Sequence, residues 1–179
     1  VSNIVAYTTP SMNGFSASLA MIPAEGDDVD QDGNDDTGLN DGMSYSLSYS
    51  RDDLYLAIAG DQDIDKQDLT RAIAHYKINQ LTLGFMYQQN ENNLGTKDES
   101  GYFVSAAYKL DKTISLKAQY GSIEDDADGD EETTFSLGAD YKLAKNTKLF
   151  AFYTDNTDSE MDADDDEFSA IGIGMEHKF

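Results

Sequence analysis

The sequence predicts an all-β protein, an antiparallel transmembrane β-barrel, and three observations lead to this fold class. Apolar and polar residues alternate with a period of two along most of the 179 residues, which is typical of strands with one apolar face. Tight turns and long acidic connections separate the alternating runs in strict rotation. Tyrosines recur near both ends of the runs, as they do in the aromatic girdles of membrane barrels.

The alternating runs define eleven predicted strands, close to the length of about 9–11 residues that a tilted strand needs to cross a bilayer. In chain order they span residues 2–9, 14–22, 43–50, 54–61, 69–78, 81–88, 101–110, 113–121, 133–143, 148–154 and 168–179. The predicted short turns are 10–13, 51–53, 79–80, 111–112 and 144–146, and the predicted long loops are 23–42, 62–68, 89–100, 122–132 and 155–167. Short turns at one end and long loops at the other are typical of outer-membrane barrels.

Three strands that run from a long loop to a short turn share a similar ending: "AIAHYKI" at 72–78, "VSAAYKL" at 104–110 and "LGADYKL" at 137–143. Period two places the apolar set, including Tyr76, Tyr108 and Tyr141, on one face and the more polar set on the other. In a membrane barrel the apolar face must meet lipid, so the polar face lines the lumen. Tyr87, Tyr120 and Tyr153 are expected to lie outward near the acidic-loop end.

The composition restricts the function. The chain carries 35 acidic and only 12 basic residues, a formal charge of −23, which argues against nucleic acid as a partner. All but five of the acidic residues lie in the predicted long loops or at the strand ends that run into them; the five are Asp52, Asp53, Asp111, Asp140 and Glu176. The charge therefore describes one rim of the molecule. There is no cysteine and no apolar run long enough for a transmembrane helix.

The sequence resembles the general diffusion porins of Gram-negative outer membranes. "SNIVAYTTPSMNGFSASLAM" resembles the hairpin that follows the constricting third loop of the family, and "DDLYLAIAGDQ" resembles a later strand. "GIGMEHKF" resembles the C-terminal signal, in which Phe179 would be read by the assembly machinery. The resemblance implies a homotrimer in the outer membrane, in contact with lipid and lipopolysaccharide. It also implies passive diffusion of small hydrophilic solutes and ions, without catalysis or a cofactor.

Eleven strands are fewer than the roughly 16 of such porins, and an odd number does not return a single-chain barrel to its starting side. We therefore expect residues 1–179 to be a single barrel domain that is the C-terminal part of a porin. The N-terminal strands and the constriction loop would come from the same chain or from a second one. Ala6 stands where many family members have a lumenal basic residue, so part of the usual basic ladder is absent.

Alternation points a set of charged and polar side chains into the lumen, where they would set a transverse field and an ion preference. The basic members are Arg71, Lys77, Lys109, Lys117, Lys142 and Lys178, and the others are His75, Asp140 and Glu176. Pairing within the wall, with Asp140 or Glu176 for the lysines and with Asp68 for Arg71, is the simpler alternative. His75 and His177 alternate onto opposite faces, so no serine–histidine–acid set of a hydrolase is indicated.

The segment "DDVDQDGNDD" spaces oxygen ligands as in a calcium-binding loop, but Leu39 stands at the position of the bidentate glutamate. Its candidate ligands are Asp28, Asp30, Asp32, Asn34 and Asp36. The simpler interpretation is a solvated acidic rim that gathers Ca²⁺ or Mg²⁺ loosely, bridges to lipopolysaccharide phosphates and attracts cations.

Two other functions remain open. A soluble, secreted, calcium-binding β-protein such as an adhesin module would fold without detergent. A substrate-specific channel, for instance for an oligosaccharide, would need an inward aromatic track, for which Tyr55, Phe103, Phe150 and Phe152 are the candidates.

Overall fold

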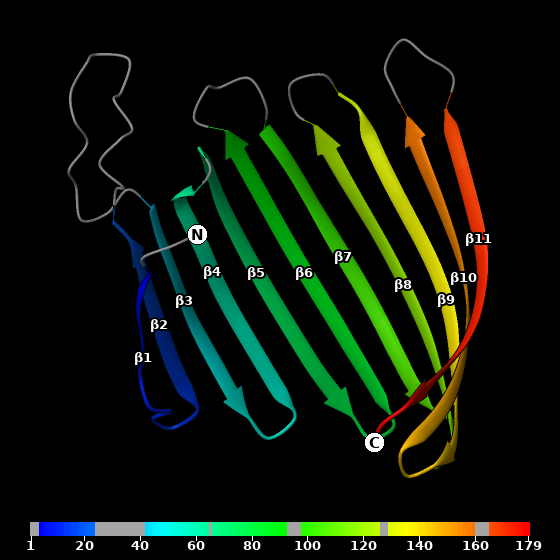
Figure 1. Ribbon diagram of the computed structural model, residues 1–179. Coiled ribbons are helices and arrows are strands. Elements are labelled where there is room, and N and C mark those ends of the chain that lie inside the picture. The colour runs from blue at the N-terminus through cyan, green and yellow to red at the C-terminus, as the bar shows by residue number, and fades with distance from the viewer. Residues whose placement is uncertain (1–3, 24–41, 65, 93–97, 126–128, 160–164) are drawn as a thin grey trace.

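The computed structural model describes residues 4–23, 42–64, 66–92, 98–125, 129–159 and 165–179. These residues form eleven antiparallel strands in one sheet, and each strand pairs with its neighbours in the sequence (Figure 1). The strands are β1 (Val5–Thr8), β2 (Phe15–Ile22), β3 (Gly42–Arg51), β4 (Leu54–Ile64), β5 (Gln67–Ile78), β6 (Leu81–Asn92), β7 (Asp98–Lys109), β8 (Ile114–Asp125), β9 (Glu131–Ala144), β10 (Thr147–Ser159) and β11 (Asp166–His177). Within this part of the chain, no helix has the length and hydropathy needed to cross a membrane.

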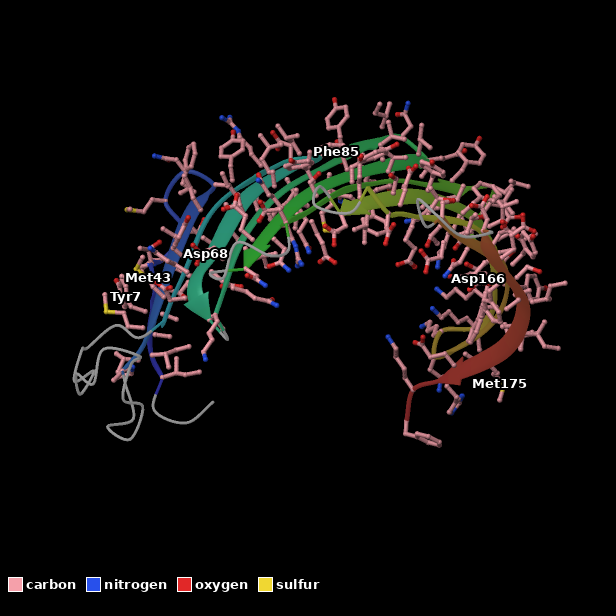
Figure 2. The ribbon with its side chains drawn as sticks, turned by 90° about the horizontal axis from the view of Figure 1, so that it is seen from above. Tyr7, Met43, Asp68, Phe85, Asp166 and Met175 are labelled. Carbon is pink, nitrogen blue, oxygen red and sulfur yellow. The ribbon has the colours of Figure 1, made fainter. Side chains whose placement is uncertain are left out.

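The sheet bends into an arc with a convex and a concave side (Figure 2). Its polypeptide path is a simple meander, so β1 and β11 are the two edge strands. No hydrophobic side chain of the described residues is buried. Large apolar side chains instead lie exposed, such as Phe85 at 45% and Ile173 at 84%. The sheet thus has no core between packed layers, unlike a soluble β-sandwich.

The predicted strands are all present, but the strands extend further into the acidic segments than the alternation indicated. β4 continues to Ile64 and β5 begins at Gln67. The predicted long loop at 62–68 is therefore wrong, because only two residues separate the two strands. Asp68 Oδ1 accepts a hydrogen bond from Asp63 N (2.8 Å) at this connection. The backbone pairs continue because hydrogen bonding between strands does not depend on apolar alternation, which stops where the strands leave the apolar layer.

The β8–β9 hairpin is extended in the same way. β8 continues to Asp125 and β9 begins at Glu131, where the sequence predicted a loop at 122–132. Asp125 N donates to Asp130 O (2.9 Å), and this bond closes the end of the β8–β9 hairpin. Many acidic side chains expected in loops are therefore fixed on strands, where their facing direction is set by the pleat.

Three of the five short turns contain residues with a positive φ. Asp52 (φ 51°) and Asn79 (φ 55°) each begin a two-residue hairpin connection, as type I′ and II′ turns require. Gly14 (φ 91°) precedes β2, and a Cβ there would lie 2.6 Å from the carbonyl oxygen of Ser50. Only glycine fits this close approach of two backbones.

The last strand ends two residues earlier than predicted, at His177. Lys178 N still donates to the carbonyl oxygen of Asn146 (2.9 Å), and Asn146 Nδ2 donates to Lys178 O (3.1 Å). Phe179 lies beyond this pairing and is fully exposed. Its ring contacts that of His177 edge-on, with centroids 4.9 Å apart.

Candidate functional site

The candidate site is the concave face, whose residues follow from the register. Residues directly opposite each other in an antiparallel pair share a face. His75 stands opposite Gly84, which stands opposite Ser105, which stands opposite Gln119. The row continues through Ser136 and Thr154. Polar and small residues thus cross β5 to β10 in an unbroken line.

The convex face is apolar by the same argument. Leu116 stands opposite Ala139, Ala139 opposite Ala151, and Ala151 opposite Ile173. Phe85 stands opposite Val104 one hairpin earlier, and Figure 2 places it on the outer side of the arc. A sheet with a charged concave side and an apolar, uncovered convex side is suited to lipid outside and water inside.

Tyrosines border this apolar band at both ends. Near the acidic end, Tyr87 pairs with Ala72 and Tyr102, and Tyr120 pairs with Val104 and Phe135, so both lie on the convex face. Tyr76, Tyr108 and Tyr141 lie on the same face near the short turns. Tyrosine rings at such boundaries keep the hydroxyl in water and the ring in the apolar layer.

The structure brings most of the predicted lumenal charges together on the turn-side half of the concave face. In the strand register, Lys109 stands opposite Ser115, Lys117 stands opposite Ala107, and Lys142 stands opposite Lys148. Lys178 follows the end of β11. Lys77 shares this face on β5, opposite Thr82, and its Nζ lies 3.7 Å from Asp53 Oδ1. Their contribution to ion preference stays a prediction.

An ion-pair network joins four neighbouring strands. Lys117 Nζ on β8 lies 2.6 Å from Asp140 Oδ2 on β9, and Lys148 Nζ on β10 lies 3.8 Å from the same oxygen. Lys148 Nζ also lies 3.1 Å from Glu176 Oε2 on β11, and Glu176 Oε1 lies 3.5 Å from Lys178 Nζ. The two carboxylates therefore alternate with three lysines along one wall.

Lys148 is the residue that the sequence reasoning missed. It lies at the start of a predicted strand, two residues before Phe150, which was placed inward. Because the two residues are two positions apart, Lys148 lies on the same face as Phe150. In the structure it stands opposite Glu176. The signal was therefore present in the sequence, because Lys148 is the first residue of the predicted strand 148–154.

Four members of the network, Asp140, Lys148, Glu176 and Lys178, line a recess at the turn end with a volume of about 1030 Å³. Six lysines line it: Lys109, Lys112, Lys142, Lys145, Lys148 and Lys178. The acidic lining residues are Asp111, Asp140 and Glu176. In a chain with a net charge of −23, this recess is a local region of positive charge.

The alternative interpretation expected an ion pair between Arg71 and Asp68, and the structure does not contain this pair. Arg71 Nε donates to Gln88 Oε1 (3.0 Å) on the neighbouring strand, and its Nη2 contacts the same oxygen. Residues 68 and 71 differ by an odd number, so the pleat places them on opposite faces. The register agrees, because Asp68 pairs with Glu91 and Arg71 pairs with Gln88.

The inward aromatic residues cover glycines of the adjacent strand. A Cβ on Gly121 would lie 2.2 Å from the ring of Phe103, and a Cβ on Gly172 would lie 2.4 Å from the ring of Phe152. Phe150 covers Gly174 in the same way. These rings therefore lie along the wall over bare backbone. Tyr55 is the fourth candidate and pairs with His75 on the concave face.

The two histidines lie on opposite faces, as the alternation indicated. His75 lies on the concave face beside Gly84 and Ser105 and lines a hollow with Phe103 and Gln119. His177 lies on the convex face opposite Thr147, with Nδ1 2.8 Å from Thr147 Oγ1.

The five candidate calcium ligands, Asp28, Asp30, Asp32, Asn34 and Asp36, lie outside the described residues. Within the described residues, no group of three or more histidine and acidic side chains is placed to hold a metal ion.

The fold and this two-sided wall define a β-barrel protein of the outer-membrane class. A family model described as Gram-negative porin matches residues 1–161. The chain therefore belongs to the Gram-negative porin family, and this membership assigns it to the outer membrane. No curated protein sequence matches the chain.

Several solved structures share the fold at low sequence identity. The anion-selective porin from Comamonas acidovorans superposes with a TM-score of 0.78 and 18% identity, over 99% of this chain and 59% of that one. Outer-membrane expressed OmpT of Vibrio cholerae gives 0.72 and 15%, over 97% and 64%. OmpF of Salmonella typhi, in complex with daunomycin, gives 0.66 and 16%, over 97% and 61%. The chain thus spans about three fifths of the length of these structures.

Proposed function

We propose that this chain forms most of the wall of a water-filled outer-membrane channel, through which small hydrophilic solutes and ions diffuse passively. One observation carries the proposal: a continuous sheet of eleven described strands with an apolar convex face and a charged concave face. Lipid cannot hydrogen-bond polar groups, whereas water solvates lysine and carboxylate side chains. The polar face must therefore meet water and the apolar face must meet lipid.

The edges of the sheet support a larger assembly. Within the described residues, β1 and β11 each pair with only one neighbour, and an open edge within lipid would leave backbone groups without hydrogen-bond partners. Further strands, in this protein or in a second chain, would close the barrel at about 16 strands. We extend the proposal to a homotrimer in contact with lipopolysaccharide, as the family resemblance implies.

Passive diffusion requires no catalytic group, and the family favours a channel over an enzyme. Specificity would depend on pore width and wall charge, together with a loop that narrows the pore. The acidic rim would raise the local concentration of cations, including loosely held Ca²⁺ or Mg²⁺, at the entrance.

The two alternatives have less support. A soluble adhesin module would bury its apolar side chains, whereas none of those described is buried. A sugar-specific channel would need aromatic rings that project toward the solute. Phe103, Phe150 and Phe152 instead lie against glycines.

Liposome swelling with the complete protein tests the proposal. We expect sugars to enter at rates that fall steadily with their size and do not saturate. Liposomes of the same lipid without protein are the control. Absence of swelling would contradict a channel, and saturable entry of a single sugar class would favour the substrate-specific alternative.

A further inference from the structure

Three strands carry an acidic and a basic residue ten positions apart. The pairs are Glu99 and Lys109 on β7, Glu132 and Lys142 on β9, and Asp158 and Lys148 on β10. An even spacing keeps both members on one face, and ten residues of strand span about 33 Å. In each pair the acidic residue lies at the long-connection end and the lysine at the short-turn end (Figure 1).

The acidic residues of these pairs and their neighbours on β8 and β11 form a row across the concave face. Glu99 stands opposite Asp125, Glu132 stands opposite Asp158, and Asp158 stands opposite Asp166. Direct like-charge neighbours on one face of a sheet repel each other. On β7 to β11, every lysine or arginine of the described residues lies in the half of its strand nearest the short turns or in the turns themselves. The long-connection end of this wall is thus negative.

The opposite end of the same wall is positive. Lys109, Lys117, Lys142, Lys148 and Lys178 lie there against Asp140 and Glu176. Both carboxylates are engaged in the network with Lys117, Lys148 and Lys178. Lys109 and Lys142 make no ion pair within the described residues, so their charges add to the potential of the recess.

We propose that the lumen is polarised along its axis and conducts ions asymmetrically, with larger currents when the long-connection side is positive. This inference rests on the proposed channel function. It differs from a transverse field because the charges of opposite sign are separated along the strands and lie on the same wall.

The asymmetry follows from which ions each end admits. The acidic end concentrates cations and the basic end concentrates anions. When the long-connection side is positive, the field drives cations inward from the acidic end and anions inward from the basic end, so mobile ions accumulate in the pore. The opposite voltage draws both kinds of ion out, and the depleted middle of the pore then conducts less.

The test is current through the complete protein in a planar bilayer, with all channels inserted in one direction. We expect the currents at equal and opposite voltages to differ about twofold in about 0.1 M salt and to become equal near 1 M, because the screening length falls from about 10 Å to about 3 Å. A symmetric current in dilute salt would overturn the inference. No current in any salt would overturn the proposed function instead.

Two double variants locate the asymmetry. Lys109→Gln with Lys142→Gln removes lysines that make no described ion pair, and Glu132→Gln with Asp158→Asn removes two acidic neighbours that repel each other. Each is expected to reduce the asymmetry in dilute salt while keeping the wild-type conductance at high salt, which shows an intact barrel.

Lys66→Gln is the control for the lysine variant, since it removes one positive charge, half of the change in the double variant, from the turn at the other end of the sheet. The asymmetry should not decrease in this variant. Asymmetry that persists unchanged in both double variants would contradict an origin in the two charged rows.

Discussion

Lys117 Nζ and Asp140 Oδ2 lie 2.6 Å apart across β8 and β9, and this contact connects the lysines of the wall to a shared carboxylate. Asp140 also lies 3.8 Å from Lys148. One acidic side chain thus moderates two cations that would otherwise repel each other. The charge at this mouth is therefore sensitive to a single residue.

Asp140→Asn is expected to shift the channel toward anions. The substitution leaves Lys117 without its carboxylate partner, while Lys148 keeps Glu176 at 3.1 Å, so the barrel should remain folded. An exposed ion pair contributes only about 0–1 kcal/mol to stability. The reversal potential under a salt gradient measures the shift.

Asp52→Asn is the matched control for this prediction. It removes the same charge from an exposed turn residue that pairs with Arg51. An equal shift in both variants would show that overall charge, and not the network at the mouth, sets the preference.

Ala118→Arg is expected to destabilise the barrel strongly. Ala118 lies on the convex face opposite Leu137, between Leu116, which stands opposite Tyr108, and Tyr120, and arginine at the midplane of a membrane barrel costs about 2–4 kcal/mol. The midpoint of urea unfolding in lipid vesicles measures the change. Gln119→Arg, on the concave face of the same strand, should be tolerated, and an equal loss in both variants would contradict the assigned faces.

Gly121→Ala is expected to push the ring of Phe103 away from the wall and reduce single-channel conductance. The new methyl group would lie 2.2 Å from the present ring position. Adding Phe103→Ala should restore the conductance, because no ring then projects into the lumen. If the double variant conducted as poorly as Gly121→Ala alone, the wall position of Phe103 would not be the cause.

Asp111→Ala is expected to weaken the β7–β8 turn at neutral pH. Asp111 Oδ1 accepts hydrogen bonds from Thr113 N (2.6 Å), Thr113 Oγ1 (2.7 Å) and Ile114 N (2.8 Å). The bond from the Thr113 side chain, followed by those from the two backbone N–H groups, lowers the pKa of Asp111.

The pH dependence of this turn follows from that direction. A depressed pKa stabilises the folded state above the ordinary aspartate value of about 3.9, and the stabilisation is lost as pH falls through the folded-state pKa. Thermal unfolding at neutral and at strongly acidic pH measures it. The difference between the two should be smaller in Asp111→Ala than in the wild type, and an unchanged difference would show that other groups are responsible.

The sequence predicted the number and facing of the strands because period-two alternation depends directly on the contrast between lipid and water. It placed the strand ends less well. Around Ile64 and Asp125 the side chains are no longer sorted by lipid, although the backbone pairs continue. The acidic residues that form the row on β7 to β11 were therefore assigned to loops.

The network of charges was only partly predictable. Residues an even number of positions apart share one face of a strand, which is enough to place Lys117 and Asp140 inward. The same rule argues against an ion pair between Arg71 and Asp68. The contacts depend on register, which joins residues such as Lys148 and Glu176 that are 28 positions apart in the sequence. Register is set by turn geometry and by pairing along the whole strand, so the partners appear only in the folded sheet.

Cysteine accessibility tests directly whether the wall has water on its concave face and lipid on its convex face. The chain has no cysteine of its own, so single substitutions give a clean signal with a membrane-impermeant thiol reagent. Ser105→Cys and Ala106→Cys are adjacent on β7 and face opposite sides. In the membrane-embedded protein, we expect rapid labelling at position 105 and protection at position 106, while equal labelling at both positions would contradict the assigned faces.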